Sequence, residues 1–110
     1  KKKIVDMLFS LNLLPAWFPR SASQLPYLTG ELHNAIIGFL ASTPSLLLAI
    51  NQEDLTKETE QQNLPGTTAE YPNWRRKMRY TVSQLRTEPE AGNFTAMIRH
   101  WISRTNRGNI

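Results

Sequence analysis

The apolar residues of this chain recur with helical spacing in some stretches and are nearly absent from others. From residue 4 to residue 14 they follow i, i+3, i+4 and i+7 steps (Ile4, Met7, Leu8, Leu11 and Leu14). This spacing predicts an amphipathic helix that Pro15 stops. Residues 16–28 contain two more prolines and two serines, so they predict a loop. We therefore read residues 1–28 as a helix followed by a proline-containing loop.

A second helix is predicted to begin after Thr29. Threonine is a favoured N-cap, and Glu31 places a carboxylate in the first turn, where the helix dipole favours it. The sequence Ser42-Thr43-Pro44 ends this helix. Its expected buried positions are Leu32, Ala35, Ile36, Phe39 and Leu40.

Residues 45–50, Ser-Leu-Leu-Leu-Ala-Ile, are short, almost continuously apolar and bounded by Pro44 and a polar segment. They favour a strand buried on both faces. A helix followed by such a strand is one unit of a parallel sheet, so we predict the α/β class, helix-rich with one or few strands. One strand cannot satisfy its own backbone hydrogen bonds, so its neighbours must come from missing parts of the chain or from another copy. The alternative is a small, mainly α domain.

Two more helices are expected towards the C-terminus. Asn73 is predicted to cap the first, with Trp74, Met78, Val82 and Leu85 on its apolar face, and Thr87-Glu88-Pro89 breaks it. The last is predicted to open at Gly92-Asn93, with Gly108 beyond its end. Its apolar positions are Phe94, Met97, Ile98, Trp101 and Ile102.

The segment from Asn51 to about Pro72 lacks apolar periodicity. Such a segment of about twenty residues is long for a compact domain and is usually either functional or disordered. It contains Gln61, Gln62 and Asn63, whose amides both donate and accept hydrogen bonds, as sugar hydroxyls require. Pro65-Gly66 would fix the backbone that presents them. An ordinary polar turn is the alternative reading.

The 110 residues suffice for one small domain with one core. The chain has no cysteine, which fits a reducing compartment, and its longest apolar run is far too short to span a bilayer. The net charge of +4 comes largely from residues 1–3 and 75–79. No nucleic-acid-binding motif accompanies these charges, so a solvated face is favoured over a phosphate-binding patch. Because the chain lacks an initiator methionine, we expect a piece of a longer protein.

Catalytic chemistry is not expected of this chain alone. Its acidic residues include Glu53 and Asp54, which we expect to pair with Arg75 or Arg76 or to cap a helix rather than to act as acid or base. His33 and His100 lie on different predicted helices with no ligand-spaced neighbours, so no metal site is expected. There is no nucleophile elbow and no phosphate-cradling glycine loop, so the chain alone shows no pairing of a nucleophile with a base.

The order of residues in the long polar segment is more informative than its composition. Residues 51–55 (Asn-Gln-Glu-Asp-Leu), 60–67 (Glu-Gln-Gln-Asn-Leu-Pro-Gly-Thr) and 72–77 (Pro-Asn-Trp-Arg-Arg-Lys) form three ordered blocks. They closely resemble the C-terminal signature of the 4-alpha-glucanotransferases, the amylomaltases or disproportionating enzymes of glycoside hydrolase family 77. The resemblance covers roughly residues 25–105 and is most specific from Glu53 to Lys77.

The resemblance implies a (β/α)8 barrel, of which residues 29–110 look like the last strand, a substrate-cleft loop and the closing helices. It implies a retaining double displacement by an aspartate and a glutamate, which transfers α-1,4-glucan segments between maltooligosaccharides without a cofactor. These two carboxylates are implied to lie upstream of this chain, so the isolated chain is expected to be inactive.

By the same resemblance, Asn63, Pro65 and Gly66 match a loop at the rim of the glucan-binding cleft. Asn63 is the best candidate for a sugar contact. Glu53, Asp54, Trp74, Arg75 and Arg76 match residues that we expect to hold the loop in place. We expect a cytoplasmic protein whose partners are α-1,4-glucans rather than nucleic acid or membrane, with the isolated chain forming a homodimer. The alternatives are a non-catalytic glucan-binding module and a mainly helical, self-associating interaction domain.

Overall fold

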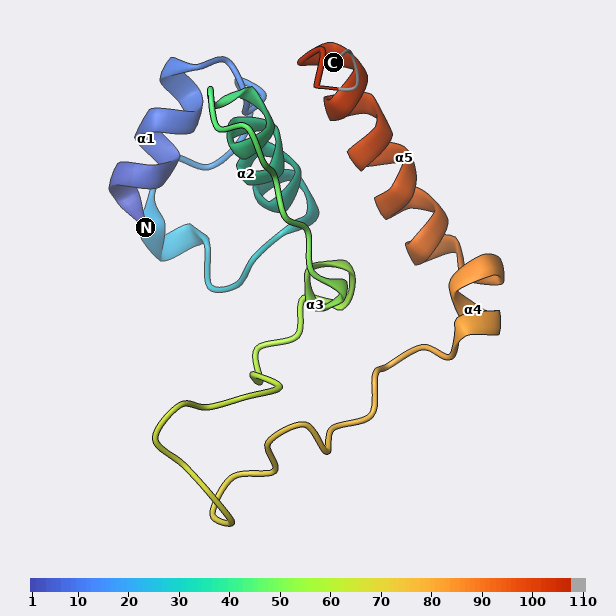
Figure 1. Ribbon diagram of the computed structural model, residues 1–110. Helices are drawn as coiled ribbons and strands as arrows, with labels where there is room; N and C mark the ends of the chain where they lie inside the picture. The colour runs from blue at the N-terminus through green and yellow to red at the C-terminus, as the bar shows by residue number, and fades with distance from the viewer. Residues whose placement is uncertain (108–110) are drawn as a thin grey trace. The chain divides into compact units, whose positions relative to one another are not determined.

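The computed structural model describes residues 1–107, apart from the side chain of Ala22. The described chain contains helices but no strand (Figure 1). The helices are α1 (Lys2–Ser10), the 3-10 helix η1 (Ala22–Gln24), α2 (Gly30–Ser42), α3 (Gln52–Thr56), α4 (Val82–Thr87) and α5 (Pro89–Arg104). The chain divides into two compact units, residues 1–48 with 96–107, and Ala49–Thr95. Within residues 1–107, no helix combines the length and the apolar character needed to cross a membrane.

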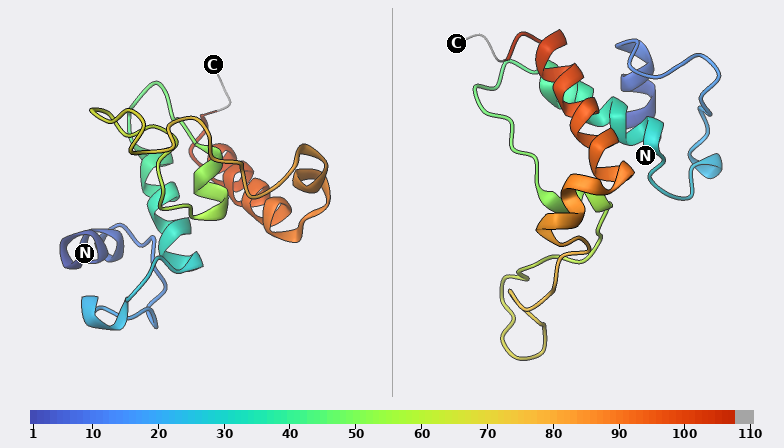
Figure 2. Two further views of the ribbon diagram at one scale, coloured as in Figure 1. Left: turned by 90° about the horizontal axis from the view of Figure 1, so that it is seen from below. Right: turned by 90° about the vertical axis from the view of Figure 1, so that its right-hand side faces the viewer.

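The core of the first unit is built by α1, the loop after it and α2 (Figure 2). Val5 and Leu8, one helical turn apart on α1, are fully buried. The face predicted for this helix was partly wrong, since Ile4 and Leu11 are each 49% exposed. The buried hydrophobic residues of this cluster are Val5, Leu8, Leu14, Phe18, Leu25 and Ala35.

The first helix ends earlier than predicted, at Ser10 rather than beside Pro15. Asn12 adopts a left-handed conformation, with φ of 55°, which asparagine tolerates better than most residues. The backbone N–H of Leu13 then donates to the carbonyl of Leu8 at 2.9 Å, which closes the end of the helix. A local turn therefore stops the helix before the proline is reached.

The predicted start of α2 is confirmed, because the Thr29 hydroxyl accepts the backbone N–H of Leu32 at 3.2 Å. Its predicted buried face was only partly right. Ala35 is buried, but Leu40 is 40% exposed, and Gly38 lies directly under the Trp101 ring. The Trp101 indole also donates to the side-chain oxygen of Asn34 at 2.8 Å. Packing on more than one side of α2 widened the buried surface beyond a single apolar stripe.

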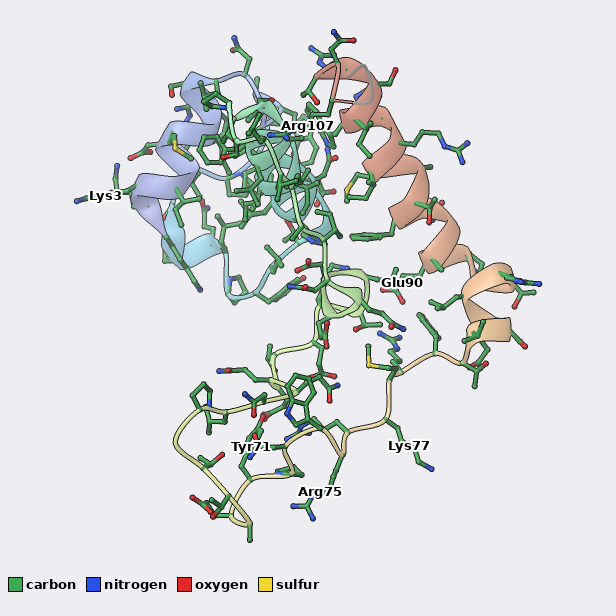
Figure 3. All side chains as sticks on the ribbon, viewed as in Figure 1. Lys3, Tyr71, Arg75, Lys77, Glu90 and Arg107 are labelled. Carbon is green, nitrogen blue, oxygen red and sulfur yellow. The ribbon has the colours of Figure 1, made fainter. Side chains whose placement is uncertain are left out.

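Arg107 holds the end of α2 (Figure 3). Its guanidinium donates to the carbonyls of Ala41 at 2.5 Å, Thr43 at 2.8 Å and Ser45 at 2.8 Å. Carbonyls at a helix C-terminus have no partner within the helix, and the helix dipole favours a cation there. The predicted stop at Gly108 lies outside the described residues.

The predicted strand at residues 45–50 was wrong. This segment is irregular, and Leu46 and Leu47 are 97% and 88% exposed. The physical reason is the lack of a partner, since an isolated extended segment cannot form ladder hydrogen bonds. The helix-rich alternative describes this chain, with the leucine run neither helical nor paired within residues 1–107.

In the second unit, the helix predicted to begin at Asn73 was wrong. Residues 73–75 lie in a turn, residues 76–80 are irregular, and α4 begins only at Val82. Thr81 caps it, because its hydroxyl accepts the Gln84 N–H at 3.2 Å and its own N–H donates to the Gln84 side chain at 2.9 Å. The last helix, α5, begins at Pro89 rather than at Gly92-Asn93, as proline is well suited to a first helical position.

Candidate functional site

Residues 57–81 leave α3, fold back on themselves and return to α4 (Figures 1 and 2). Hydrogen bonds join the outgoing and returning arms. The backbone N–H of Trp74 donates to the carbonyl of Gln62 at 2.7 Å, and the Tyr71 hydroxyl donates to the carbonyl of Gln61 at 2.6 Å. The segment that lacked apolar periodicity is therefore ordered by polar contacts.

A tight turn at Leu64–Thr67 lies between the two arms. The Thr67 N–H donates to the Leu64 carbonyl at 3.3 Å, and the Thr67 hydroxyl donates to the same oxygen at 2.6 Å. Gly66 has φ of 84°, which places it in the region that favours glycine. Pro65 followed by such a glycine is the sequence preference of a type II turn.

The side chain of Asn73 fastens this turn to the returning arm. Its oxygen accepts the backbone N–H of Leu64 at 2.7 Å, and its nitrogen donates to the Thr67 hydroxyl at 2.9 Å. The sequence interpretation gave Asn73 to a helix cap and missed this role. The sequence feature that could have indicated this role is the asparagine itself, because asparagine side chains often take the place of backbone groups in the hydrogen bonds of turns.

The residues predicted to contact sugar lie at this turn and face solvent. Asn63, Pro65 and Gly66 are all exposed. Within residues 1–107, the Asn63 amide makes no hydrogen bond, and no heavy atom lies within 4 Å of the position that a Gly66 Cβ would take. The turn therefore presents a free amide and open backbone on a fixed frame.

The residues predicted to support the loop lie in two parts of the chain, in α3 and in the returning arm of the loop. Asp54 closes the start of α3 by accepting the Asn51 N–H at 2.8 Å, so it acts as a helix cap. Arg76 binds Glu60 at 3.1 Å rather than Glu53 or Asp54, and its guanidinium lies over the Tyr71 ring at 5.5 Å. Glu53 is half-buried.

Trp74 and Arg75 are exposed side chains whose backbones are held in turns. The Arg75 N–H donates to the Pro72 carbonyl at 3.1 Å, while its side chain projects away from the loop (Figure 3). The Trp74 ring is 74% exposed, and its φ of 58° is unusual for a large side chain. The backbone of these two residues, more than their side chains, contributes to the loop frame.

Glu90 ties together the two ends of the loop. Its carboxylate accepts a short hydrogen bond from the Tyr80 hydroxyl and lies 3.7 Å from Arg79 and 4.0 Å from Lys57. The hydrogen bond to Glu90 raises the pKa of Tyr80, with a smaller contribution from burial. Sequence reasoning missed this cluster, because its members are far apart in the chain.

A second carboxylate orders the far end of the loop. The hydroxyl of Thr68 donates to Glu70 at 2.9 Å, and the Thr68 N–H donates to the same oxygen at 3.0 Å. Hydrogen bonds from the backbone of Glu70 itself, then from Thr68, lower the pKa of Glu70. The Glu70 carboxylate is therefore engaged within the loop itself.

A family model described as 4-alpha-glucanotransferase matches residues 11–83, which include this loop. A 4-alpha-glucanotransferase of Mycobacterium tuberculosis is 51% identical over 41 residues, which are 37% of this chain and 6% of that protein. A 4-alpha-glucanotransferase of Haemophilus influenzae is 31% identical over 78 residues, 71% of this chain and 11% of that protein. The chain thus spans a small part of the relatives that it matches. No solved structure gives a significant match.

Proposed function

Because this chain belongs to the 4-alpha-glucanotransferase family, we propose that it is the C-terminal part of an enzyme that transfers α-1,4-glucan segments between maltooligosaccharides. In this proposal the chemistry is a retaining double displacement without a cofactor. The two catalytic carboxylates belong to upstream sequence, and none of the carboxylates in this chain takes either role. The isolated chain is accordingly inactive and supplies a loop at the rim of the glucan-binding cleft.

The observation that carries this proposal is the turn fixed by Asn73. The Leu64–Thr67 turn is closed internally and fastened at two points, while Asn63, Pro65 and Gly66 remain exposed. An amide held in place before a ligand arrives loses less conformational entropy on binding than a mobile one. Asn63 can donate one hydrogen bond and accept another, which matches a pair of neighbouring sugar hydroxyls.

Titration of the 110-residue chain with maltoheptaose by calorimetry tests this proposal. We expect binding that Asn63→Ala weakens about 10-fold, the scale of one or two lost hydrogen bonds in a binding site. Asn93→Ala is the matched control, because Asn93 is an exposed amide on α5 in the same unit. Equal effects of the two substitutions would contradict the role of Asn63. Absence of binding would contradict a sugar site on this chain.

We further propose that residues 29–110 form the closing part of the parent barrel and that residues 45–50 pack against the rest of it. The exposure of Leu46 and Leu47 supports this, because such apolar side chains are normally covered. In the isolated chain, the same surface would be covered by a second copy, giving a homodimer. Light scattering should then give twice the mass of one chain, and Leu46→Lys with Leu47→Lys should return the mass to that of one chain. An unchanged mass would contradict this.

The cellular setting is part of the same proposal. We place the parent enzyme in the cytoplasm, which the absence of cysteine fits. We assign it no nucleic-acid partner, since the basic residues 75–77 lie at the end of a turn and in the irregular segment after it, not on a helix suited to a nucleic-acid groove. Weak and salt-insensitive retention on immobilised DNA would agree with this, whereas steeply salt-dependent binding would contradict it.

A further inference from the structure

A cleft of about 390 Å³ lies beside the doubled-back loop, separate from the exposed turn. Its lining combines the Trp74 ring with polar residues between Asn51 and Gln62. The volume is at the lower end of the roughly 300–1,000 Å³ of small-molecule sites. Asn63, Pro65 and Gly66 are not among the residues that line it.

The position of Trp74 in this cleft is fixed by its backbone. Its N–H is bonded to the Gln62 carbonyl at 2.7 Å, and its left-handed φ of 58° is held by this bond between the two arms. The ring is nevertheless 74% exposed. An exposed side chain of this size does not contribute the stabilising free energy that its burial would give. A backbone held in this way presents the indole at the cleft as an exposed apolar surface.

The polar side of the cleft is lined by three carboxylates, those of Glu53, Glu58 and Glu60, and by amide side chains. Glu58 accepts the N–H groups of Thr59 and Glu60 at 3.0 and 3.2 Å. Glu60 is bound to Arg76 at 3.1 Å. These two carboxylates are thus already engaged. Gln61, in contrast, is exposed, and its amide makes no hydrogen bond within the described residues.

We propose that this cleft is a second sugar-binding site, in which Trp74 stacks on a glucose ring of a glucan and the Gln61 amide binds a ring hydroxyl. A pyranose has an apolar face of C–H groups and a rim of hydroxyls, which matches an aromatic ring flanked by amides. This assignment rests on the proposed function, since it takes the ligand to be an α-1,4-glucan. It gives Trp74 direct contact with the ligand, in addition to its backbone's part in the loop.

The test is calorimetric titration of the full 110-residue chain with maltoheptaose. Trp74→Ala should weaken binding at least about 10-fold, as removal of a central aromatic contact usually does. Trp74→Phe should retain most of the affinity, because it keeps an aromatic platform. Trp17→Ala is the matched control, since Trp17 is 71% exposed and belongs to the other unit. Circular dichroism of each variant would show that the helices are retained.

A second readout follows the ring itself. Maltoheptaose should change the tryptophan fluorescence of the wild-type chain, and Trp74→Phe should abolish that change while sugar still binds. If Trp74→Ala binds as tightly as wild type, the inference is overturned, and a loss in Asn63→Ala would leave the exposed turn as the sugar site. If Trp74→Ala loses binding and Asn63→Ala keeps it, the cleft is the site and the turn is not. Absence of binding by the wild-type chain overturns both.

Discussion

The side-chain oxygen of Asn73 accepts the backbone N–H of Leu64 at 2.7 Å. This bond and the one from the Asn73 amide nitrogen to the Thr67 hydroxyl join two of the three ordered sequence blocks, residues 60–67 and 72–77. They hold a turn in which no residue is fully buried. The order of the candidate site therefore rests on side-chain to backbone hydrogen bonds rather than on apolar packing.

Asn73→Ala should loosen this turn. Each lost hydrogen bond contributes about 1 kcal/mol, so amide hydrogen exchange at Leu64 should accelerate about 10-fold or more. Asn63→Ala is the control in the same loop, because the Asn63 side chain makes no hydrogen bond within residues 1–107. Equal exchange rates in the wild-type chain and Asn73→Ala would show that the Asn73 contacts do not order the turn.

Two glycines in the second unit should respond oppositely to alanine. Gly66 has φ of 84°, so Gly66→Ala should destabilise the turn by about 1–2 kcal/mol, the usual cost of a side chain in a left-handed conformation. Gly92 lies inside α5 with open space around its Cα, so Gly92→Ala should stabilise the helix by about 0.8–1 kcal/mol. Urea denaturation measures both, and a stabilising Gly66→Ala would contradict the turn geometry.

The elements that the sequence predicted well are those determined by local chemistry. The cap at Thr29 follows from a short-range hydrogen bond, and the break at Thr87-Glu88-Pro89 follows from proline geometry. The family was also identifiable, because three ordered blocks carry more information than hydrophobic periodicity does.

The predictions that were wrong concern segments whose structure depends on contacts that hydrophobic periodicity does not indicate. Trp74 and Met78 have helical spacing, but Asn73 binds Leu64 across the loop instead of capping a helix. Likewise, the strand at residues 45–50 was inferred from apolar character, while a strand also needs a partner. In the candidate site, Glu90 was missed for the same reason, since its partners Lys57 and Tyr80 meet it only in the folded chain.

Gly38→Ala should be strongly destabilising. A Cβ at this position would overlap the Trp101 ring, and overpacking of this kind usually costs about 1–3 kcal/mol. For a chain of this size, the melting temperature should fall by roughly 4–8 °C for each kcal/mol. Gly30→Ala, at the start of the same helix, meets no atom within 4 Å and should leave the melting temperature nearly unchanged. Comparable melting temperatures for the two variants would contradict the close packing of Gly38 on Trp101.

The contact between Tyr80 and Glu90 should make the second unit sensitive to alkaline pH. The hydrogen bond raises the pKa of Tyr80 above its ordinary value of 10.0, so the folded chain holds the phenol proton more tightly than the unfolded chain. Its contribution to stability is therefore fully present below pH 10.0 and is lost as the pH rises through the folded-state pKa. Tyr80→Phe removes the titrating group and should abolish this part of the pH dependence.

The measurement is ultraviolet titration of tyrosinate in the wild-type chain, in Tyr80→Phe and in Glu90→Ala. The step that titrates above pH 10.0 should be absent from Tyr80→Phe and should move to lower pH in Glu90→Ala, because the carboxylate that accepts the phenol proton has been removed. Identical titration curves for the wild-type chain and Glu90→Ala would show that the two groups are not hydrogen-bonded in solution. In that case, the ion pairs of Glu90 with Lys57 and Arg79 would join the two ends of the loop without the phenol.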